Sequence, residues 1–404
     1  MKDFYDVLIV GAGHGGTKLA TTLVQQNFTG SIGLISADPN PPYERPPLSK
    51  DYFLGEKPFE RLLFRPEAFW ADSGVDLVSG RRVVSVNADA HRIGLDDGSA
   101  AGYGTLVWAT GGDARRLTCP GSDLPGIHTV RTRTDIDTIK AALEAVEDVV
   151  VIGGGYIGLE AASALVKFGK RVTVLEAMDR VLARVTGETI SRFFEAQHRA
   201  HGVDVRTNAM VTQLNGATQL EGVTLSDGTQ MPAQMAIVGI GIIPAVDPLI
   251  TAGAAGGNGV RVDGRCAASL PDVFAIGDCA LHTNAFAGGA EVRLESVQNA
   301  HDQATLVARI LAGDDAVYEA VPWFWSNQYD LRLQTAGISA GYDATVVRGD
   351  PDQKGFSVLY FKEDHLISID AVNRPKDYMQ GRKTVMQPFA NPANLADPDV
   401  SLLA

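Results

Sequence analysis

The chain has 404 residues but only three cysteines, Cys119, Cys266 and Cys279. None of them forms a C-x-x-C or C-x-x-x-x-C spacing, so the sequence predicts neither a redox-active dithiol nor a metal site. An iron–sulfur centre also requires a cluster of cysteines, which is missing here. We therefore expect three reduced, mostly buried thiols in a reducing compartment.

Excess positive charge and long apolar runs are missing as well. The formal net charge is −13, which argues against a general nucleic-acid binder and against attachment to an anionic membrane. No apolar run approaches the roughly 20 residues that span a bilayer. The chain enters a strand by Val7 with no signal-peptide apolar core before it, so we predict a cytoplasmic location.

Aromatic residues make up only 7% of the chain, whereas glycines number 43. This balance is typical of an α/β protein with many tight turns between strands and helices. The length suggests roughly two or three domains. The alternation of strands and helices favours a doubly wound parallel architecture, with a smaller antiparallel region from about Pro322. From Pro388 the polar, proline-containing sequence predicts an arm or a loosely ordered tail.

Two glycine fingerprints of the form G-x-G-x-x-G each follow an apolar run. Residues 11–16 follow the run 7–10, and residues 153–158 follow the run 149–152. Between a strand and a helix, this pattern places a dinucleotide pyrophosphate at the helix N-terminus. A chain that binds two dinucleotides usually transfers hydride or electrons between them, which favours a flavin–nicotinamide oxidoreductase. The predicted contacts are Gly11, Gly13, Gly15 and Gly16 in the first loop and Gly153, Gly155, Tyr156, Ile157 and Gly158 in the second.

The residues at the ends of the second strands distinguish the two fingerprints. Glu176 ends the strand 171–175, where a carboxylate can accept both ribose hydroxyls and would repel a 2′-phosphate. NADH is therefore favoured over NADPH, with Arg184 as a further candidate near the ribose or phosphate. At the corresponding place in the first fingerprint stand Ser36 and Asp38, which could bind a ribose, although Asp38 could equally be a turn residue before a proline.

Several further motifs appear in one order along the chain and are specific in combination. The chain resembles the ferredoxin reductases that serve bacterial oxygenases and cytochromes P450, the putidaredoxin reductase type. The resemblance rests on residues 42–50 (Pro-Tyr-Glu-Arg-Pro-Pro-Leu-Ser-Lys), 109–112 (Ala-Thr-Gly-Gly), 152–160, 239–241, 276–278, 295–297 and 322–326 (Pro-Trp-Phe-Trp-Ser).

This resemblance implies an α/β fold like that of glutathione reductase. Two Rossmann-type dinucleotide-binding domains are followed by a C-terminal α+β interface domain. The implied FAD-binding domain is discontinuous and covers residues 1–112 and 243–320. The NAD-binding domain covers residues 113–242 and the C-terminal domain residues 321–404.

The resemblance also implies which residues contact FAD. They are Gly11, Gly13, Gly15, Gly16, Ser36, Asp38, Arg45, Lys50, Val83, Thr110, Gly111, Arg131, Asp278, Val297 and Trp325. Lys50 and Glu160 match a pair that the family places near flavin N5. The hypothesis is that Lys50 stabilises negative charge on the reduced flavin, while Glu160 orients Lys50 and contacts the nicotinamide.

The implied function is transfer of electrons from NADH through FAD to a small [2Fe–2S] ferredoxin, which feeds a cytochrome P450 or a Rieske-type oxygenase. The ferredoxin would dock transiently by electrostatics on a monomer or weak homodimer. A rubredoxin or monodehydroascorbate-type reductase remains an alternative. A flavoprotein that senses NADH, like the apoptosis-inducing factors, is a second alternative from a different class.

Overall fold

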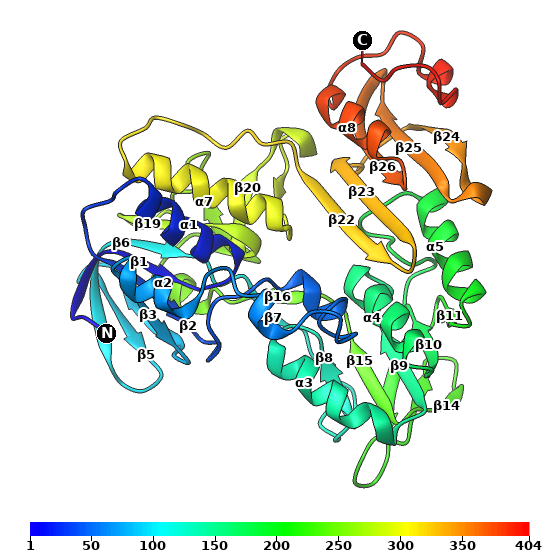
Figure 1. Cartoon of the computed structure of the whole chain (residues 1–404), viewed down its shortest axis with the longest axis horizontal. Coiled ribbons are helices and arrows are strands. Elements are labelled where there is room, and N and C mark those ends of the chain that lie inside the picture. The colour runs from blue at the N-terminus through cyan, green and yellow to red at the C-terminus, as the bar shows by residue number, and fades with distance from the viewer. Residues whose placement is uncertain (404) are drawn as a thin grey trace. The chain divides into compact units, whose positions relative to one another are not determined.

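The computed structural model describes residues 1–403, which form two compact units (Figure 1). Unit 1 consists of Met1–Arg45, Pro58–Asp113 and Ile243–Pro322. Unit 2 consists of Pro46–Lys57, Ala114–Ile242 and the described chain from Trp323. The short segment Pro46–Lys57 thus belongs to unit 2, and the division into three domains stays a prediction.

A seven-stranded sheet forms the centre of unit 1, in the order β3-β2-β1-β6-β5-β4, with β19 also paired to β6. Its strands are β1 (Phe4–Val10), β2 (Ile32–Ser36), β3 (Val75–Ser79), β4 (Val83–Asn87), β5 (Arg92–Leu95), β6 (Ala100–Trp108) and β19 (Val273–Ala275). The β4–β5 and β5–β6 pairs are antiparallel, and the other pairs are parallel. Val10 pairs with both Ile35 and Trp108, so three parallel strands end level beside the first glycine loop.

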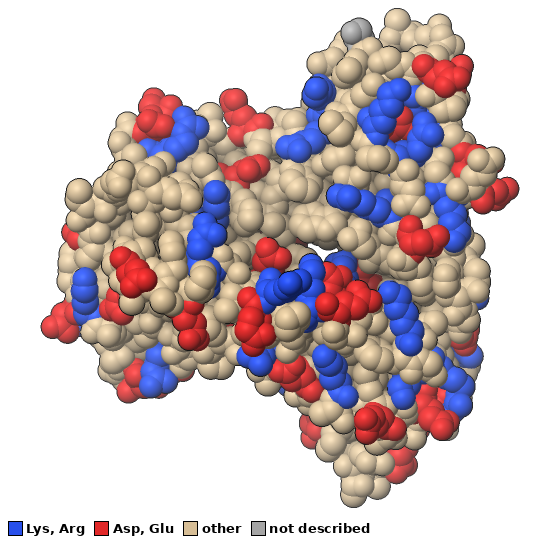
Figure 2. Space-filling view, in the orientation of Figure 1, with Lys and Arg blue, Asp and Glu red and all other residues tan. Residues whose placement is uncertain are grey.

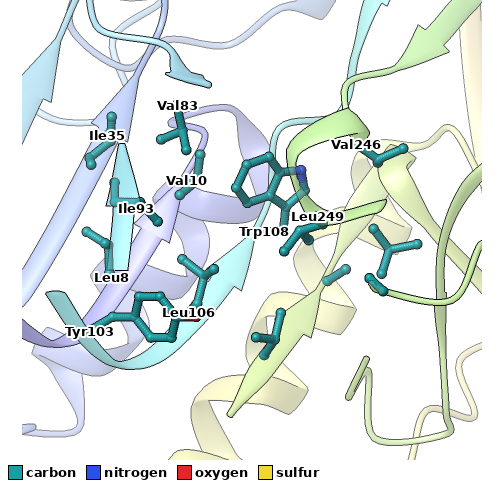
Figure 3. Close-up of a cluster of buried hydrophobic side chains, with 14 of the residues drawn as sticks. Leu8, Val10, Ile35, Val83, Ile93, Tyr103, Leu106, Trp108, Val246 and Leu249 are labelled. Carbon is teal, nitrogen blue, oxygen red and sulfur yellow. The ribbon is translucent and has the colours of Figure 1, made fainter. Parts of the chain in front are cut away.

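Side chains on both faces of this sheet are buried, and helices of unit 1 pack against it. The helices of unit 1 are α1 (His14–Gln25), α2 (Glu67–Asp72), α6 (Asp247–Thr251) and α7 (Val297–Leu311). Helices α1 and α7 lie side by side (Figure 1). The core in Figure 3 contains Trp108, whose indole N–H donates to the carbonyl of Ala245 at 2.9 Å and so remains satisfied among apolar neighbours.

Unit 2 contains a second parallel sheet, in the order β11-β10-β9-β15-β8. Its strands are β8 (Ile127–Thr129), β9 (Asp148–Ile152), β10 (Arg171–Leu175), β11 (Asp204–Arg206) and β15 (Met235–Val238). The helices are α3 (Arg133–Ala142), α4 (Tyr156–Lys167) and α5 (Glu188–Ala200), and a small antiparallel sheet contains β12 (Val211–Asn215), β13 (Gly222–Leu225) and β14 (Gln230–Pro232). The central strand β9 is buried from Val149 to Ile152, as expected of a parallel strand covered on both faces.

The C-terminal part of unit 2 is an antiparallel sheet, which confirms the predicted change of character after Pro322. Its order is β22-β23-β26-β25-β24. The elements are β22 (Trp323–Gln328), β23 (Leu331–Gly337), β24 (Ala344–Asp350), β25 (Gly355–Lys362), β26 (His365–Val372) and α8 (Pro375–Thr384). Short strands elsewhere are β7 (Gly112–Ala114), β16 (Ile242–Pro244), β17 (Gly256–Gly257), β18 (Gly259–Val262), β20 (Ala280–Thr283) and β21 (Glu291–Val292).

The segment after Pro388 does not form the arm that its polar sequence predicts. Arg348 is buried and forms an ion pair with Asp377 at 3.1 Å. Its guanidinium also donates to the carbonyl oxygens of Leu395, Asp397, Pro398 and Val400. The prediction was wrong because a buried arginine with several fixed donors binds this segment through its backbone, which side-chain polarity does not reveal.

Within residues 1–403, none of the helices combines the length and the apolar composition needed to cross a membrane.

Candidate active site

The first glycine loop brings the backbone close to itself at the end of β1. Gly11 has φ +106°, and a Cβ on it would lie 2.3 Å from the carbonyl oxygen of Ala109. A Cβ on Gly16 would lie 1.8 Å from the Gly11 carbonyl oxygen. Around Gly13, by contrast, a Cβ would meet nothing within 4 Å. The start of α1 is therefore open to a ligand, which fits the FAD pyrophosphate that the sequence predicts here.

The second glycine loop repeats this geometry in unit 2. Gly153 has φ +107°, and a Cβ on Gly158 would lie 2.1 Å from the Gly153 carbonyl oxygen. Gly155 again leaves open space where a Cβ would stand. Tyr156 and Ile157 form the first turn of α4. The N-terminus of α4 therefore fits a second pyrophosphate, that of the nicotinamide cofactor.

Glu176 follows β10 and faces the second glycine loop. Its carboxylate accepts hydrogen bonds from the backbone N–H of Gly154 at 2.7 Å and of Met178 at 2.8 Å. Each carboxylate oxygen keeps a further lone pair that can accept a ribose hydroxyl. Arg184 is exposed, and its guanidinium lies 3.8 Å from the position of a Cβ on Gly241. Glu176 and Arg184 are thus available at this edge of the sheet.

The predicted ribose contacts of the first fingerprint are already engaged with the local chain. Ser36 Oγ accepts a hydrogen bond from the backbone N–H of Asp38 at 3.2 Å. The Asp38 carboxylate accepts from the backbone and side chain of Asn40 and from the Tyr43 hydroxyl at 2.7 Å, with Arg45 at 3.7 Å. These are the bonds of a turn residue, so the ribose contact of Asp38 stays a prediction.

The structure brings Lys50 and Glu160 together from positions 110 residues apart. Lys50 follows the short 3-10 helix Pro46–Ser49, and Glu160 lies in α4. The Lys50 Nζ and Glu160 Oε2 atoms are 2.6 Å apart, and the Glu160 side chain is only 2% exposed. Burying an ion pair removes water from both charges, and this cost can exceed the attraction between them. Such a pair stabilises the fold only where further hydrogen bonds reach the carboxylate oxygens.

Two serines that the sequence analysis missed supply those hydrogen bonds. Ser49 Oγ donates to Glu160 Oε2 at 2.6 Å, and Ser326 Oγ donates to Oε1 at 2.6 Å. Each serine stands inside a motif that carried the family resemblance, directly beside Lys50 or Trp325. That position was the available signal, but serine is too common in turns to indicate a role without its partner.

Two hydrogen bonds connect Tyr52, two residues after Lys50, to helix α3. The Tyr52 hydroxyl donates to Asp137 Oδ1 at 2.5 Å, and Lys140 Nζ donates to the Tyr52 carbonyl at 3.2 Å. Burial raises the pKa of Tyr52, with the neighbouring Asp137 carboxylate adding to the effect. The hydroxyl therefore stays a donor and anchors the segment on which Lys50 stands.

The remaining FAD candidates of unit 1 are distributed around its sheet. The Thr110 hydroxyl donates to the Ala245 carbonyl at 2.9 Å, and Gly111 has φ +62°. The Asp278 carbonyl accepts from Arg293 at 2.6 Å. Val83 begins β4 and Val297 begins α7.

Arg131 and Trp325 are the candidates that lie in unit 2. Arg131 precedes α3, where its backbone N–H donates to Asp135 at 3.0 Å, and Trp325 lies in β22. Because the candidates belong to different units, their convergence on one flavin stays a prediction.

Comparison with known proteins gives matches along nearly the whole chain. Residues 5–304 match the pyridine nucleotide-disulphide oxidoreductase family, and residues 323–404 match the reductase C-terminal family. The 5,5′-dehydrodivanillate O-demethylase ferredoxin reductase subunit of Sphingobium sp. is 53% identical over 401 residues, with 98% of this chain and 97% of that protein covered. Putidaredoxin reductase of Pseudomonas putida is 38% identical over 405 residues, with coverage of 98% and 96%.

Solved structures show the same fold. A ferredoxin reductase for the CYP199A2 system from Rhodopseudomonas palustris matches with a TM-score of 0.95 at 39% identity and covers 99% of each chain. The reductase in a covalent putidaredoxin reductase–putidaredoxin complex matches with a TM-score of 0.90 at 38% identity, covering 95% of this chain and 93% of the other.

The fold and the two glycine loops define an α/β oxidoreductase with two dinucleotide sites, one for FAD and one for NAD(H). The chain belongs to the ferredoxin reductases of the pyridine nucleotide-disulphide oxidoreductase family. The fold like that of glutathione reductase and the family resemblance inferred from the sequence are both confirmed.

Proposed function

We propose that this protein oxidises NADH and passes the electrons through FAD to a small [2Fe–2S] ferredoxin that feeds a cytochrome P450 or Rieske-type oxygenase. The observation that carries the proposal is the duplicated glycine loop, which offers two pyrophosphate sites in one chain. The names of the relatives support the electron acceptor, since several are ferredoxin reductases and one related structure is a covalent putidaredoxin reductase–putidaredoxin complex.

Two features of unit 2 support the proposed binding of NADH. The Glu176 carboxylate, held by two backbone N–H groups, would accept the ribose hydroxyls and repel a 2′-phosphate. The open glycine loop at α4 would bind the pyrophosphate through backbone N–H groups. FAD, when bound, supplies the chemistry that converts a two-electron donor into single electrons.

Lys50 and Glu160 are the residues that we assign to the hydride step. The family resemblance implies that they lie beside the flavin, where the Lys50 ammonium would stabilise negative charge on the reduced ring. In unit 2 the ammonium is held by Glu160 and by the Pro46 carbonyl at 3.3 Å. A charge that is held in place in advance stabilises developing charge without reorganisation.

The electron acceptor has to be a separate protein. The three cysteines are free, and two of them are buried, so they offer no ligand set for an iron–sulfur centre. On the face shown in Figure 2, basic and acidic side chains are interspersed. We therefore expect a transient docking that depends on a few local charges and weakens as salt increases. We also propose that the protein works in the cytoplasm, where thiols such as these remain reduced.

Anaerobic stopped-flow spectroscopy of the purified flavoprotein tests the proposal. NADH is expected to bleach the flavin faster than NADPH does, and a [2Fe–2S] ferredoxin is expected to reoxidise it. Lys50→Ala should slow the NADH step by about 100-fold, since one preorganised charge commonly contributes that much. Lys57→Ala is the matched control, because Lys57 pairs with Asp51 on the exposed part of the same segment. An unchanged rate in Lys50→Ala would remove the assigned role.

A rubredoxin reductase is the second candidate, because a rubredoxin-NAD(+) reductase of Pseudomonas putida is 37% identical over 371 residues. Reoxidation by rubredoxin and not by ferredoxins would favour it. A charge-transfer complex that persists for minutes after NADH addition, without reoxidation by either acceptor, would instead favour an NADH sensor.

A further inference from the structure

A line of polar side chains continues from Glu160 into the interior of unit 2, on the side away from Lys50. Gln328 lies two residues after Ser326 on the same face of β22, and its Nε2 donates to Ser326 Oγ at 3.1 Å. His198 of α5 contacts Gln328 next, with its Nε2 atom 2.8 Å from Gln328 Oε1. The Tyr329 hydroxyl lies 2.9 Å from His198 Nδ1. Four hydrogen bonds therefore connect Tyr329 to Glu160.

The charge at one end determines the direction of every bond in this chain. A carboxylate only accepts hydrogen bonds, so the Ser326 hydroxyl donates to Glu160. Ser326 then has only lone pairs left, which requires the NH₂ group of Gln328 on its side. The Gln328 oxygen consequently faces His198, whose Nε2 must carry the hydrogen, and Nδ1 is left to accept from Tyr329. All four bonds point toward Glu160.

The opposite arrangement is excluded by the bond at Glu160. If the Gln328 amide were turned over, its oxygen would need the Ser326 hydrogen, because a carbonyl oxygen cannot donate. The Ser326 oxygen would then face the Glu160 carboxylate at 2.6 Å with no hydrogen between them. Two acceptors at that separation repel each other, so the ionised Glu160 selects one orientation of Gln328 and one tautomer of His198.

Burial makes this selection strict. Glu160, Ser326, Gln328 and His198 are each at most 2% exposed, so water cannot replace a wrongly directed bond. Burial lowers the pKa of His198 to about 4, and the nearby His201 adds to the decrease, so the ring is neutral at physiological pH. Its titratable neighbours are Tyr329, whose pKa is raised by burial, and His201. A neutral ring carries a single hydrogen, which is why its tautomer matters.

Tyr329, at the far end of this line of hydrogen bonds, has a strained backbone conformation. Tyr329 has φ +56° in the two-residue turn between β22 and β23, a position at which asparagine or glycine is usual. Its ring stacks on His201 with centroids 3.7 Å apart. A bulky residue in this conformation costs stability and persists where its surroundings hold it, and Tyr329 contacts both His198 and His201.

The line of hydrogen bonds from Tyr329 to Glu160 does not conduct protons. A hop through Gln328 would turn its amide into an unstable imidic acid, whereas hydroxyl groups and imidazoles exchange protons readily. The four bonds therefore transmit orientation and polarisation instead, which strengthens the final bond to the carboxylate.

We propose that His198, Gln328 and Ser326 are positioning residues that hold the Glu160 carboxylate, and through it Lys50, in one geometry. This inference depends on the proposed role of the Lys50–Glu160 pair in the NADH step. Coupling between two sites is reciprocal, so the charge of Glu160 also selects the Nε2–H tautomer of His198.

The tautomer is measured directly by NMR of ¹⁵N-histidine-labelled protein in its oxidised, FAD-bound form, with His198→Asn used to assign the signal. The wild type should show a neutral His198 with hydrogen on Nε2. Glu160→Gln should produce a mixture of tautomers, because an amide can donate as well as accept. Ser49→Ala is the control, since Ser49 contacts Glu160 outside the chain and should leave the His198 signal unchanged. An Nδ1–H ring in the wild type, or no change in Glu160→Gln, would overturn the proposal.

Kinetics supply the second test through Gln328→Glu. The new carboxylate competes for the Ser326 hydrogen, so the rate of flavin bleaching by NADH should fall about 10-fold, with the NADH dissociation constant unchanged and a new pH dependence. Asn327→Asp is the matched control, because Asn327 is the exposed neighbour on the other face of β22 and receives the same charge. If Gln328→Glu does not fold, Ser326→Ala should slow the rate and Ser326→Thr should restore it.

The outcomes also separate this inference from the proposed function. Equal rates in Gln328→Glu and Asn327→Asp, or in Ser326→Ala and the wild type, would refute the positioning role. A wild-type flavin that NADH does not bleach would refute the proposed function, while the tautomer measurement would still decide the direction of the hydrogen bonds.

Discussion

The two glycine loops can be compared position by position, one in each unit of the molecule. Gly11 and Gly153 have φ values of +106° and +107°. A Cβ on Gly16 or Gly158 would approach the carbonyl oxygen of that first glycine to 1.8 Å or 2.1 Å. The backbones of the two loops are thus nearly identical, as binding the same pyrophosphate group requires.

The side chains around the loops differ. Glu176 accepts two backbone N–H groups beside the second loop, whereas Asp38 is engaged by Asn40 and Tyr43. The fourth residue of each fingerprint differs too: His14 Nδ1 lies 3.4 Å from His301 Nε2, while the Tyr156 ring stacks on Phe324 at 4.6 Å. The two loops thus share a backbone suited to a pyrophosphate, while the residues after the second strand make different contacts, and the choice between nucleotides is expected to lie there.

The largest effects are expected when alanine replaces the glycine of closest approach. Gly16→Ala should yield protein without FAD, and Gly158→Ala should retain FAD but lose reduction by NADH, because each Cβ would overlap a carbonyl oxygen. Such overpacking typically costs about 1–3 kcal/mol or more. The flavin absorbance and its bleaching by NADH measure the two results. Gly264→Ala is the control, since its Cβ would make an ordinary contact at 3.7 Å; an identical loss in all three variants would contradict the comparison.

A smaller effect is expected at the strand-end acids. Glu176→Ala should raise the KM for NADH about 10-fold to 100-fold and narrow the preference over NADPH, since charge-assisted hydrogen bonds are worth about 1.5–3 kcal/mol. Asp38→Asn should leave the preference for NADH over NADPH unchanged, because Asp38 lies in unit 1 and the glycine loop proposed for NADH lies in unit 2. Steady-state rates with both nucleotides provide the measurement. An unchanged NADH preference in Glu176→Ala would show that another residue discriminates the nucleotides.

The segment after Glu176 has a pH-sensitive anchor. The Gly187 N–H donates to the Tyr360 hydroxyl at 3.0 Å, which donates to Asp370 at 2.7 Å. Burial raises the pKa of Asp370 from 3.8 to about 7. Between pH 3.8 and about 7, Asp370 keeps its proton in the native protein but loses it in the unfolded chain. The stability of the native protein therefore falls as the pH rises toward 7. In the wild type, the ionisation of Asp370 should lower the free energy of unfolding by up to about 3 kcal/mol between roughly pH 5 and pH 8, and Asp370→Asn should abolish this decrease.

Urea unfolding of the FAD-bound protein at both pH values measures the effect of Asp370→Asn. Asp364→Asn, at an exposed position between β25 and β26, is the control and should unfold like the wild type at both. Parallel pH profiles of Asp370→Asn and the wild type would show that Asp370 does not titrate in this range.

The smallest effect concerns how the strand before each glycine loop is joined to the next strand of its sheet. In unit 2 the guanidinium of Arg171 pairs with Asp148 at 2.7 Å, and in unit 1 Asp6 accepts two hydrogen bonds from Ser31. Both arrangements lower the carboxyl pKa, so both contribute stability that is lost as the pH falls. Asp148→Asn should slightly lower the urea concentration at the midpoint of unfolding at low salt. The decrease should be smaller at high salt, since salt screens exposed ion pairs. Asp6→Asn should be insensitive to salt, and equal salt sensitivity would contradict this distinction.

Much of the fold could be predicted because local patterns report it. Helix α1 begins at His14, inside the first fingerprint, since the glycine loop turns straight into it. Strand β6 begins at Ala100, and its first residues pair antiparallel with β5. Apolar runs and glycine spacing indicate elements because each depends on residues a few positions apart.

The candidate site was predictable only in part. Glu176 and the glycine loops follow from spacing, and Lys50 and Glu160 follow from the family motifs. Ser49 and Ser326 could not be predicted as partners of Glu160, because hydrogen bonds across 111 and 166 residues have no local signal. Gln328 and His198 were beyond sequence reasoning for the same reason.

By itself, then, the sequence determined the two dinucleotide loops, the preference expected from Glu176 and the family, since each is written in residues that are neighbours along the chain. Only the tertiary structure decided what surrounds Glu160. It brings three donors from two distant segments to one carboxylate, and the direction of a hydrogen bond depends on which donor meets which acceptor in space.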